Sequence, residues 1–361
     1  MKKLYSKAVN SKRTTLRDIA QKAGLSPNAV SLALRSSPEI SPATRKRVEA
    51  LAEEMGYQRN PATSELMRQM RLRGYQKQGA TFAVVNANDD AGALQRHPTI
   101  PTYLEGIERR AERGGYGLDF FWIHQWGLRT GQWLEVFHTR NIRGILLVGL
   151  MGTHDVPDFF HPVIQQYPCA VTGVRTRSPP LSFASVDHHA LTCQAVQEAV
   201  GRGYRRPALV LDPVIDRLVM GRFTSGFAYA REALPEADRI PVYFQTSADP
   251  EPPLGFKDWF DAYQPDVVLT LYNRTRRWVE SFGTSPDPGW IQLELRPNQA
   301  DWAGMNQHND RVGEAAFELL VSALLNGETG AADFVKGVLI SPTWQDGPSL
   351  PDRGKAGDNL P

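Results

Sequence analysis

The sequence predicts an α/β protein with a small helical head and a larger core of two doubly wound, parallel-sheet subdomains. Its 361 residues are enough for more than one hydrophobic core. Residues 14–59 contain three short helical patterns with capping signals, whereas apolar runs alternate with amphipathic helical patterns from Thr81 onwards. Alternation of this kind is typical of parallel sheets that carry helices on both faces.

The first two helices of the head are delimited by capping residues. Thr15 and Asp18 form a capping box ahead of an apolar face. Gly24 can adopt the left-handed conformation that ends a helix, and Ser26-Pro27 then supplies an N-cap and a first helical residue. Two short helices joined at a glycine turn predict a helix-turn-helix.

A third helix is predicted to begin at Ser41-Pro42 and to end at Gly56.

The distribution of charge along the chain supports a binding role for this head. Residues 1–80 hold 16 Lys and Arg against 6 Asp and Glu, a net charge of +10, whereas the other 281 residues hold 25 against 33, a net charge of −8. A basic head on an acidic body indicates a polyanionic partner. A three-helix bundle without a nucleic-acid role is the alternative.

The composition argues against several classes of protein. A run of about 18 apolar residues, which a transmembrane helix needs, does not occur. Residues 1–13 are basic but are not followed by the apolar segment of a secretory signal, so we expect a disordered basic arm. Cys169 and Cys193 form neither a disulfide framework nor a metal-ligand spacing. We therefore expect buried thiols in a reduced cytosol, with no metal and no cofactor.

The head also carries a dense set of motifs. They are Thr15-Leu16-x-Asp18-Ile19-Ala20, Ala23-Gly24-Leu25-Ser26, Val30-Ser31, Ser41-x-x-Thr44-Arg45 and Gly56-Tyr57-x-x-Asn60-Pro61. This segment resembles the DNA-binding head of the LacI/GalR family of transcriptional regulators. The resemblance implies that the second helix enters the major groove of operator DNA, where Pro27, Asn28 and Leu32 face the base edges. It implies phosphate contacts from Thr15, Ser26, Ser31, Ser41, Thr44, Tyr57 and Asn60.

Two DNA-contact positions depart from the family pattern. Leu32 stands where members commonly carry Arg, and Arg35 stands where an Asn is usual. Because Leu32 cannot make a bidentate contact with guanine, we expect the base preference at the DNA position it faces to shift towards thymine, whose methyl group Leu32 can contact.

Residues 60–79 resemble the hinge helix and linker of the same family. Leu66 falls on the leucine that wedges into the minor groove, and such apolar wedges kink the duplex. Glu65 departs from the small or basic residue usual at its position. The alternative is a linker leucine that packs on the core.

Residues 80–345 are predicted to form the core, and residues 346–361 an irregular tail. The predicted strands are Phe82–Val85, Leu118–Ile123, Ile145–Val148, Ala170–Val174, Ala208–Leu211, Val267–Leu271 and Ile291–Leu295. The predicted helices are Tyr103–Arg113, Leu191–Val200, Arg222–Ala233 and Arg311–Leu325.

This core resembles the periplasmic-binding-protein-like core of the LacI/GalR family. The segments that carry the resemblance include Tyr103-Leu104-Glu105-Gly106-Ile107, Gly203-Tyr204-Arg205-Arg206-Pro207 and Arg222-x-x-x-Gly226-Phe227. The resemblance implies that the chain crosses between the subdomains near Gly203, Gly304 and Lys336. The N-subdomain would then hold residues 80–202 and 305–335, and the C-subdomain residues 203–304 and 336–345.

A small-molecule effector is implied between the subdomains, at the carboxyl ends of the strands. The resemblance suggests a sugar or another polar metabolite. Arg222 is the first candidate contact. Glu294 would replace the aspartate of a Gly-Phe-Asp motif that this chain lacks. The remaining candidates are Asn88, Tyr103, Tyr272 and Asn273.

The predicted function is therefore that of a cytoplasmic, nucleoid-associated regulator, most simply a repressor, that binds operator DNA as a homodimer under allosteric control. No P-loop, GxSxG or HExxH motif occurs, so no enzymatic activity is expected. Asp187-His188-His189 and Asp89-Asp90 are expected to be structural or solvated. The alternatives are a periplasmic-type sugar-binding protein without a DNA role and a regulator without a small-molecule effector.

Overall fold

The computed structural model describes residues 14, 16–34, 40–55, 57, 80–125, 130–245, 251–283, 287–331 and 334–354. The chain divides into two compact units, Met1–Gly74 and Tyr75–Pro361, and each is described by itself. Within the described residues, no helix is long and apolar enough to cross a membrane.

The first unit contains α1 (Leu16–Ala23), α2 (Pro27–Ala33) and α3 (Pro42–Glu54). Gly24 ends α1 with a φ of +65°, as the glycine turn predicted. The three helices enclose one small apolar core. Its buried members are Ile19, Ala20, Ala23, Val30, Ala33, Val48 and Ala52.

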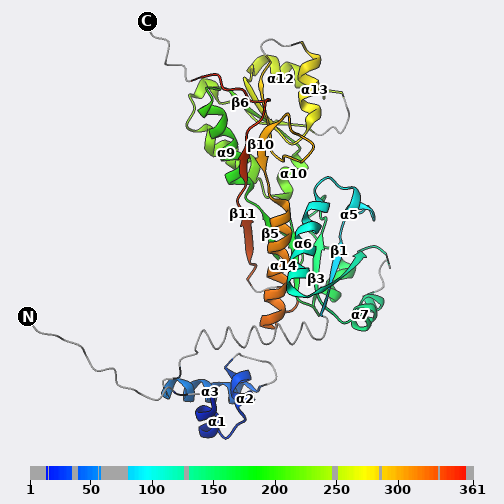
Figure 1. Ribbon diagram of the computed structural model, residues 1–361, viewed down its shortest axis with the longest axis vertical. Helices are drawn as coiled ribbons and strands as arrows, with labels where there is room; N and C mark the ends of the chain where they lie inside the picture. Colours follow the sequence, from blue (N-terminus) through cyan, green and yellow to red (C-terminus); the bar gives the residue numbers. More distant parts are fainter. Residues whose placement is uncertain are drawn as a thin grey trace, which may run out of the picture. The chain divides into compact units, whose positions relative to one another are not determined.

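The second unit contains two six-stranded sheets (Figure 1). The first sheet is parallel throughout and has the order β11-β5-β4-β3-β1-β2. The second has the order β12-β10-β9-β8-β6-β7 and is parallel except for the β10–β12 pair. The strands are β1 (Thr81–Asn86), β2 (Gly117–Trp122), β3 (Ile142–Val148), β4 (Cys169–Thr172), β5 (Ser182–Val186), β6 (Pro207–Leu211), β7 (Tyr243–Phe244), β8 (Val267–Thr270), β9 (Gly289–Gln292), β10 (Ala303–Asn306), β11 (Gly337–Ile340) and β12 (Thr343–Gln345).

Helices separate these strands, as the alternating sequence pattern predicted, and the predicted fold class is confirmed. Both sheets contribute to one continuous apolar cluster, with Val84 and Leu146 from the first and Leu209 and Ile291 from the second. The helices are α5 (Ala93–Arg96), α6 (Ile100–Gly114), α7 (Thr130–Thr139), α8 (His161–Ile164), α9 (His188–Gly201), α10 (Pro213–Leu218), α11 (Arg222–Arg231), α12 (Phe256–Tyr263), α13 (Asn273–Ser281) and α14 (Asn309–Asn326), with 3₁₀ turns at Asp158–Phe160 and Glu236–Asp238.

Helices α6 and α14 pack closely against each other beside the first sheet (Figure 1). Two glycines permit this approach. A Cβ atom on Gly106 would lie 1.8 Å from the carbonyl oxygen of Asp310, and one on Gly313 would lie 2.0 Å from that of Tyr103. Arg109 then joins the helices by donating to Asp310 at 2.7 Å and to Glu314 at 2.6 Å.

The crossings between the subdomains differ from the predicted positions. The first lies at Asp187 instead of Gly203, because α9 packs against α11 of the C-subdomain. The second, predicted near Gly304, follows Asn306, because all of β10 belongs to the second sheet. The third lies between β11 and β12 instead of near Lys336, because β11 pairs in parallel with β5 of the first sheet.

The described part of the tail, residues 346–354, contains no helix or strand and packs on the C-subdomain. Leu350 is buried in the apolar cluster. Ser349 Oγ donates to the carbonyl oxygen of Trp290 at 2.7 Å and accepts from the amide of Ala303 at 2.8 Å.

Candidate functional site

The head presents several of the predicted DNA contacts at helix starts. Ser26 is the N-cap of α2, and its Oγ accepts from the amide of Ala29 at 3.1 Å. Ser41 is the N-cap of α3, and its Oγ accepts from the amide of Thr44 at 3.2 Å. Both serines are exposed. The amino ends of α2 and α3 thus combine exposed hydroxyl groups with the positive end of a helix dipole, which suits phosphate binding.

Three further predicted contacts lie among the described residues. Pro27 is exposed at the start of α2, Leu32 is half-buried, and Tyr57 packs against the apolar core of the head. Thr15, Arg35, Asn60 and Leu66 lie outside the described residues, as do residues 1–13 and the predicted hinge. The side chains of Asn28 and Ser31 are likewise not described, so their contacts stay predictions.

Part of the positive charge of the head is used to hold it together. Arg47 Nη2 donates to the carbonyl oxygen of Ala23 at 2.9 Å, which joins α3 to the end of α1. Lys22 forms an ion pair of 2.7 Å with Glu54. Lys46 is exposed near the start of α3.

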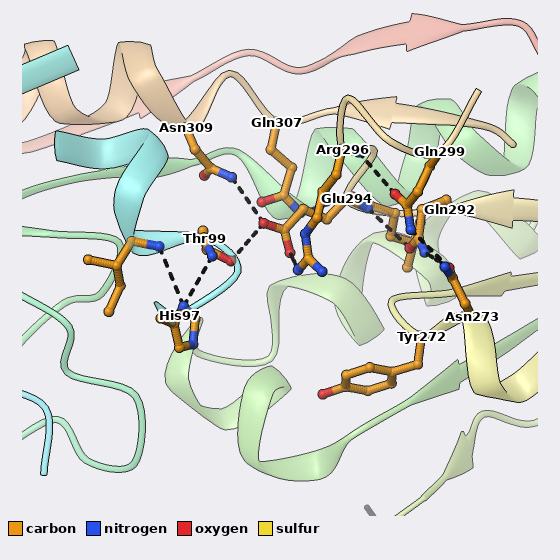
Figure 2. Close-up of polar contacts among 12 residues, drawn as sticks. His97, Thr99, Tyr272, Asn273, Gln292, Glu294, Arg296, Gln299, Gln307 and Asn309 are labelled. Carbon is orange, nitrogen blue, oxygen red and sulfur yellow. Dashed lines mark hydrogen bonds and ion pairs between the residues drawn. The ribbon is translucent and has the colours of Figure 1, made fainter. Parts of the chain in front are cut away.

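In the core, Glu294 joins the two subdomains (Figure 2). It follows β9, and its Oε1 accepts from Thr99 Oγ1 at 2.8 Å and from Asn309 Nδ2 at 3.1 Å. Both donors belong to the N-subdomain. Arg296 Nη2 donates to Oε2 at 2.9 Å. This Glu294 cluster (Thr99, Glu294, Arg296 and Asn309) therefore satisfies both carboxylate oxygens with donors of the chain itself.

Three other predicted effector contacts lie around the Glu294 cluster. Tyr103 is buried, and burial together with the negative charge of Glu294 raises the pKa of its phenol above the ordinary value. Burial likewise raises the pKa of Tyr272. Asn273 Oδ1 accepts from Gln292 Nε2 and Gln299 Nε2, each at 2.9 Å, so its oxygen is already occupied.

The other two predicted effector contacts have local partners. Asn88 Nδ2 donates to the carbonyl oxygen of Gly149 at 3.2 Å, and its Oδ1 accepts from the amide of Asp90 at 2.9 Å. Arg222 forms a long ion pair of 3.7 Å with Asp187 at the first crossing. It also lines a small cavity of about 90 Å³ with Gly173 and Ser185.

The paired histidines after β5 contact neighbouring side chains. His188 is buried, and its ring lies 4.6 Å from that of Phe223. Burial, followed by the positive charge of Arg222, lowers the pKa of His188 to about 3. His189 Nδ1 lies 3.1 Å from Ser225 Oγ. Among the described residues, no group of three or more His, Cys, Asp or Glu could hold a metal ion.

A larger cavity of about 390 Å³ opens at the carboxyl ends of β8 and β9. Its lining residues are Leu271, Tyr272, Asn273, Arg274, Arg277, Arg296 and Gln299. Tyr272 and Asn273 were predicted from the sequence, whereas the three arginines were not. The available signal was the spacing Arg274-x-x-Arg277 directly after an apolar strand, because residues three apart share one face of a helix.

Comparison with known proteins agrees with the motifs of the head. Residues 15–60 match the family model described as bacterial regulatory proteins, lacI family. The chain is 26% identical to the ribose operon repressor of Escherichia coli K12 over 327 residues, which covers 85% of the chain and 92% of that relative. It is 22% identical to the HTH-type transcriptional regulator MalR of Streptococcus pneumoniae serotype 4 over 196 residues. That match covers 54% of the chain and 56%, about half, of MalR.

Solved structures show the same fold. A complex of the transcriptional regulator CelR with cellobiose has a TM-score of 0.55 and 18% identity, covering 92% of this chain and 99% of that one. The lac repressor dimer bound to operator and the anti-inducer ONPF has a TM-score of 0.54 and 17% identity, covering 94% and 100%. The head followed by a periplasmic-binding-protein-like core is thus the shared architecture.

Proposed function

Because this chain belongs to the LacI/GalR family of bacterial regulators, we propose that it is a sequence-specific, DNA-binding transcriptional regulator that acts as a repressor. The observation that carries the proposal is the basic three-helix head. Its α2 and α3 begin with exposed serine N-caps, and its sequence matches the family model over residues 15–60. Exposed hydroxyl groups and helix amino ends position a protein on phosphates, whereas side chains of α2 would read the bases.

The proposed assembly is a homodimer with two-fold symmetry, which places two heads on the half-sites of a pseudo-palindromic operator. The lac repressor supports this proposal, because its structure of the same fold is a dimer bound to operator. The regulator would act in the cytoplasm, on the DNA of the nucleoid. Its relatives MalR and the ribose operon repressor are named as regulators, and we propose no catalytic activity for this chain.

The proposed control is allosteric, through a small molecule between the subdomains. The Glu294 cluster supports a coupling between subdomains, because two of its hydrogen bonds join Glu294 of the C-subdomain to Thr99 and Asn309 of the N-subdomain. A ligand that competes for these donors would change the relative stability of two core arrangements, and the head would respond only to that difference. A sugar or sugar-like metabolite is the proposed ligand class, since the CelR structure contains cellobiose.

A regulator without a small-molecule effector is the second candidate, because Glu294 is already satisfied by the chain itself. Thermal unfolding with a panel of sugars and other polar metabolites separates the two. A ligand that binds the folded form raises the melting temperature by mass action. A panel without any such response would favour the second candidate.

The DNA-binding proposal is tested by selecting bound DNA from a random pool with the full chain. The expected product is a pair of half-sites in inverted orientation, whose centres lie about one helical turn or a multiple of it apart. Asn28→Ala should flatten the preference at one base pair within each half-site, whereas the remaining positions keep their ranking. Recovery of DNA without a common sequence would contradict the proposal.

A further inference from the structure

The cavity at the carboxyl ends of β8 and β9 is unusually basic, and its three arginines come from one helix and one loop. Arg274 and Arg277 lie on α13, and Arg296 follows β9. Figure 2 shows Arg296 and Gln299 facing the same region as Tyr272 and Asn273. We call this cavity of about 390 Å³ the arginine pocket. Its volume falls within the range that small-molecule ligands require.

The guanidinium groups of the arginine pocket are poorly compensated by acids. Arg296 pairs with Glu294 at 2.9 Å, but Arg274 and Arg277 have no carboxylate partner among the described residues. The Nε atoms of Arg274 and Arg296 are buried and have no hydrogen-bond partner there. Burial of an unpaired donor costs free energy, and an unpaired charge costs more.

Arg274 is also held in place before any ligand binds. The guanidinium of Arg274 lies 3.9 Å from the ring centre of Tyr272, a stacking contact that fixes its plane. The first turn of α13 contains no acidic residue. The amino end of this nine-residue helix therefore adds positive potential to the same space. A neutral polyol would leave these charges unmatched, whereas an oxyanion would accept hydrogen bonds from them.

We propose that the arginine pocket binds the oxyanion group of an acidic metabolite, either a phosphate ester or a carboxylate. This proposal rests on the proposed function, because it takes the pocket as part of the ligand site of the core. It narrows the class of ligand from any sugar-like metabolite to an anionic one. Arg274 and Arg277 supply the charge. Arg296 contacts both this pocket and Glu294, so an anion there competes with Glu294 for the guanidinium of Arg296.

The test compares glucose 6-phosphate, glucuronate and neutral glucose as probes of the full-length protein at constant ionic strength. The readout is the melting temperature without DNA. At about ten times its dissociation constant, a ligand of the folded core is expected to raise the melting temperature by about 3 °C. The larger of the two anion responses identifies a phosphate ester or a carboxylate as the preferred group.

Three variants make the test specific. Arg274→Gln/Arg277→Gln should remove the response to both anions. Arg277→Gln alone, at an exposed position, should weaken it without disturbing the fold. Arg110→Gln, which changes an arginine on α6 outside the pocket, should leave the response unchanged. Anion binding by the basic head would persist in the double variant and is thereby separated from binding in the pocket.

The proposal is overturned if neither anion stabilises the native chain, if glucose stabilises it as much as the anions do, or if the double variant responds like the native chain. DNA selection with the double variant, without ligand, distinguishes this failure from failure of the proposed function. An intact operator preference with no anion response rejects only the arginine pocket. An anion response confined to the native chain, with no operator preference, rejects only the DNA-binding role.

Discussion

The head and the core use their polar side chains in opposite ways. In the head, Ser26 and Ser41 bond backbone amides three residues away and stay exposed. In the core, Glu294 bonds Thr99, which is 195 residues away, and its side chain is only 12% exposed. Local bonds leave the surface of the head available for an external partner. Long-range bonds make the core sensitive to how its subdomains meet.

The difference indicates that the head and the core have different roles, contact with an external partner for the head and response to a ligand for the core. A head held by caps and a small apolar cluster can keep its shape whatever the core does. In the core, the Glu294 cluster joins the two subdomains, so a ligand that competes for its hydrogen bonds can shift the equilibrium between two arrangements of the core. Substitutions in the core should therefore cost more stability than substitutions at the caps of the head, and they should cost it for different reasons.

The largest effect is expected where the core depends on the closest backbone approach. Gly106→Ala would place a Cβ atom 1.8 Å from the carbonyl oxygen of Asp310, so α6 and α14 must separate. The expected loss is at least about 3 kcal/mol of the free energy of unfolding, measured by chemical denaturation. Gly131→Ala is the matched control, since an added Cβ there meets nothing within 4 Å. Equal stability of the two variants would show that α6 and α14 are not packed as described.

The second largest effect is expected for Glu294→Gln, which changes the contact between the subdomains. The amide keeps the shape of the side chain but removes the charge that three donors share, and one of its groups becomes a donor facing other donors. A loss of about 2 kcal/mol is expected in chemical denaturation. Glu232→Gln changes an exposed carboxylate paired with Arg239 and should stay within about 0.5 kcal/mol of the native value. A loss for Glu294→Gln no larger than the control's would remove the basis for a coupling cluster.

His188 gives the core a predicted dependence on pH. Its folded-state pKa of about 3 lies below the ordinary value of 6.5, so below pH 6.5 the unfolded chain binds a proton that the folded chain does not. The contribution of His188 to the free energy of unfolding is therefore fully present above pH 6.5 and is lost as the pH falls towards 3. Between pH 7.5 and 5.5 the loss of unfolding free energy from this group is about 1 kcal/mol.

Chemical denaturation of His188→Gln at the two pH values measures that contribution. The variant should lose about 1 kcal/mol less than the native chain over the same interval. His138→Gln, at an exposed position on α7, should keep the native pH dependence. An unchanged pH dependence in His188→Gln would mean that His188 is not held neutral in the folded core.

The smallest effect is expected at the caps of the head. Ser41→Ala removes the acceptor for the amide of Thr44 and should cost about 1 kcal/mol, seen as roughly fivefold less protection of α3 amides in hydrogen exchange. Ser41→Asp keeps a cap and should retain protection. Its charge should nevertheless weaken DNA binding if Ser41 faces a phosphate. Native DNA affinity in Ser41→Asp would place Ser41 away from the DNA backbone.

The elements of the head were predictable because their signals are local. Each cap acts over three residues, so Ser26-Pro27 and Ser41-Pro42 mark the starts of α2 and α3 directly. The crossings of the core were not predictable in the same way. Strand β11 is short and half-exposed, and only its pairing with β5, about 150 residues earlier in the chain, assigns it to the first sheet.

The candidate site shows the same limit. Glu294 was predicted from its place after a late strand, but Thr99 and Asn309 gave no signal, because three-dimensional packing alone brings them to it. Arg222, the first candidate, lies beside Asp187 at a crossing and lines the small cavity, and its contact with an effector stays a prediction. The spacing of Arg274 and Arg277 was visible in the sequence, but the convergence of Arg296 on them depends on the neighbouring positions of β8 and β9.

The most direct test of sequence-specific DNA binding is an affinity measurement with the full chain. It compares the selected operator with a scrambled duplex across a range of salt concentrations. A regulator of this kind should prefer the operator by at least about 10³-fold. With six or more phosphate contacts, its affinity should fall by about 10³-fold or more between 50 and 200 mM salt. Equal affinity for both duplexes, or an operator affinity that does not change with salt, would contradict the account.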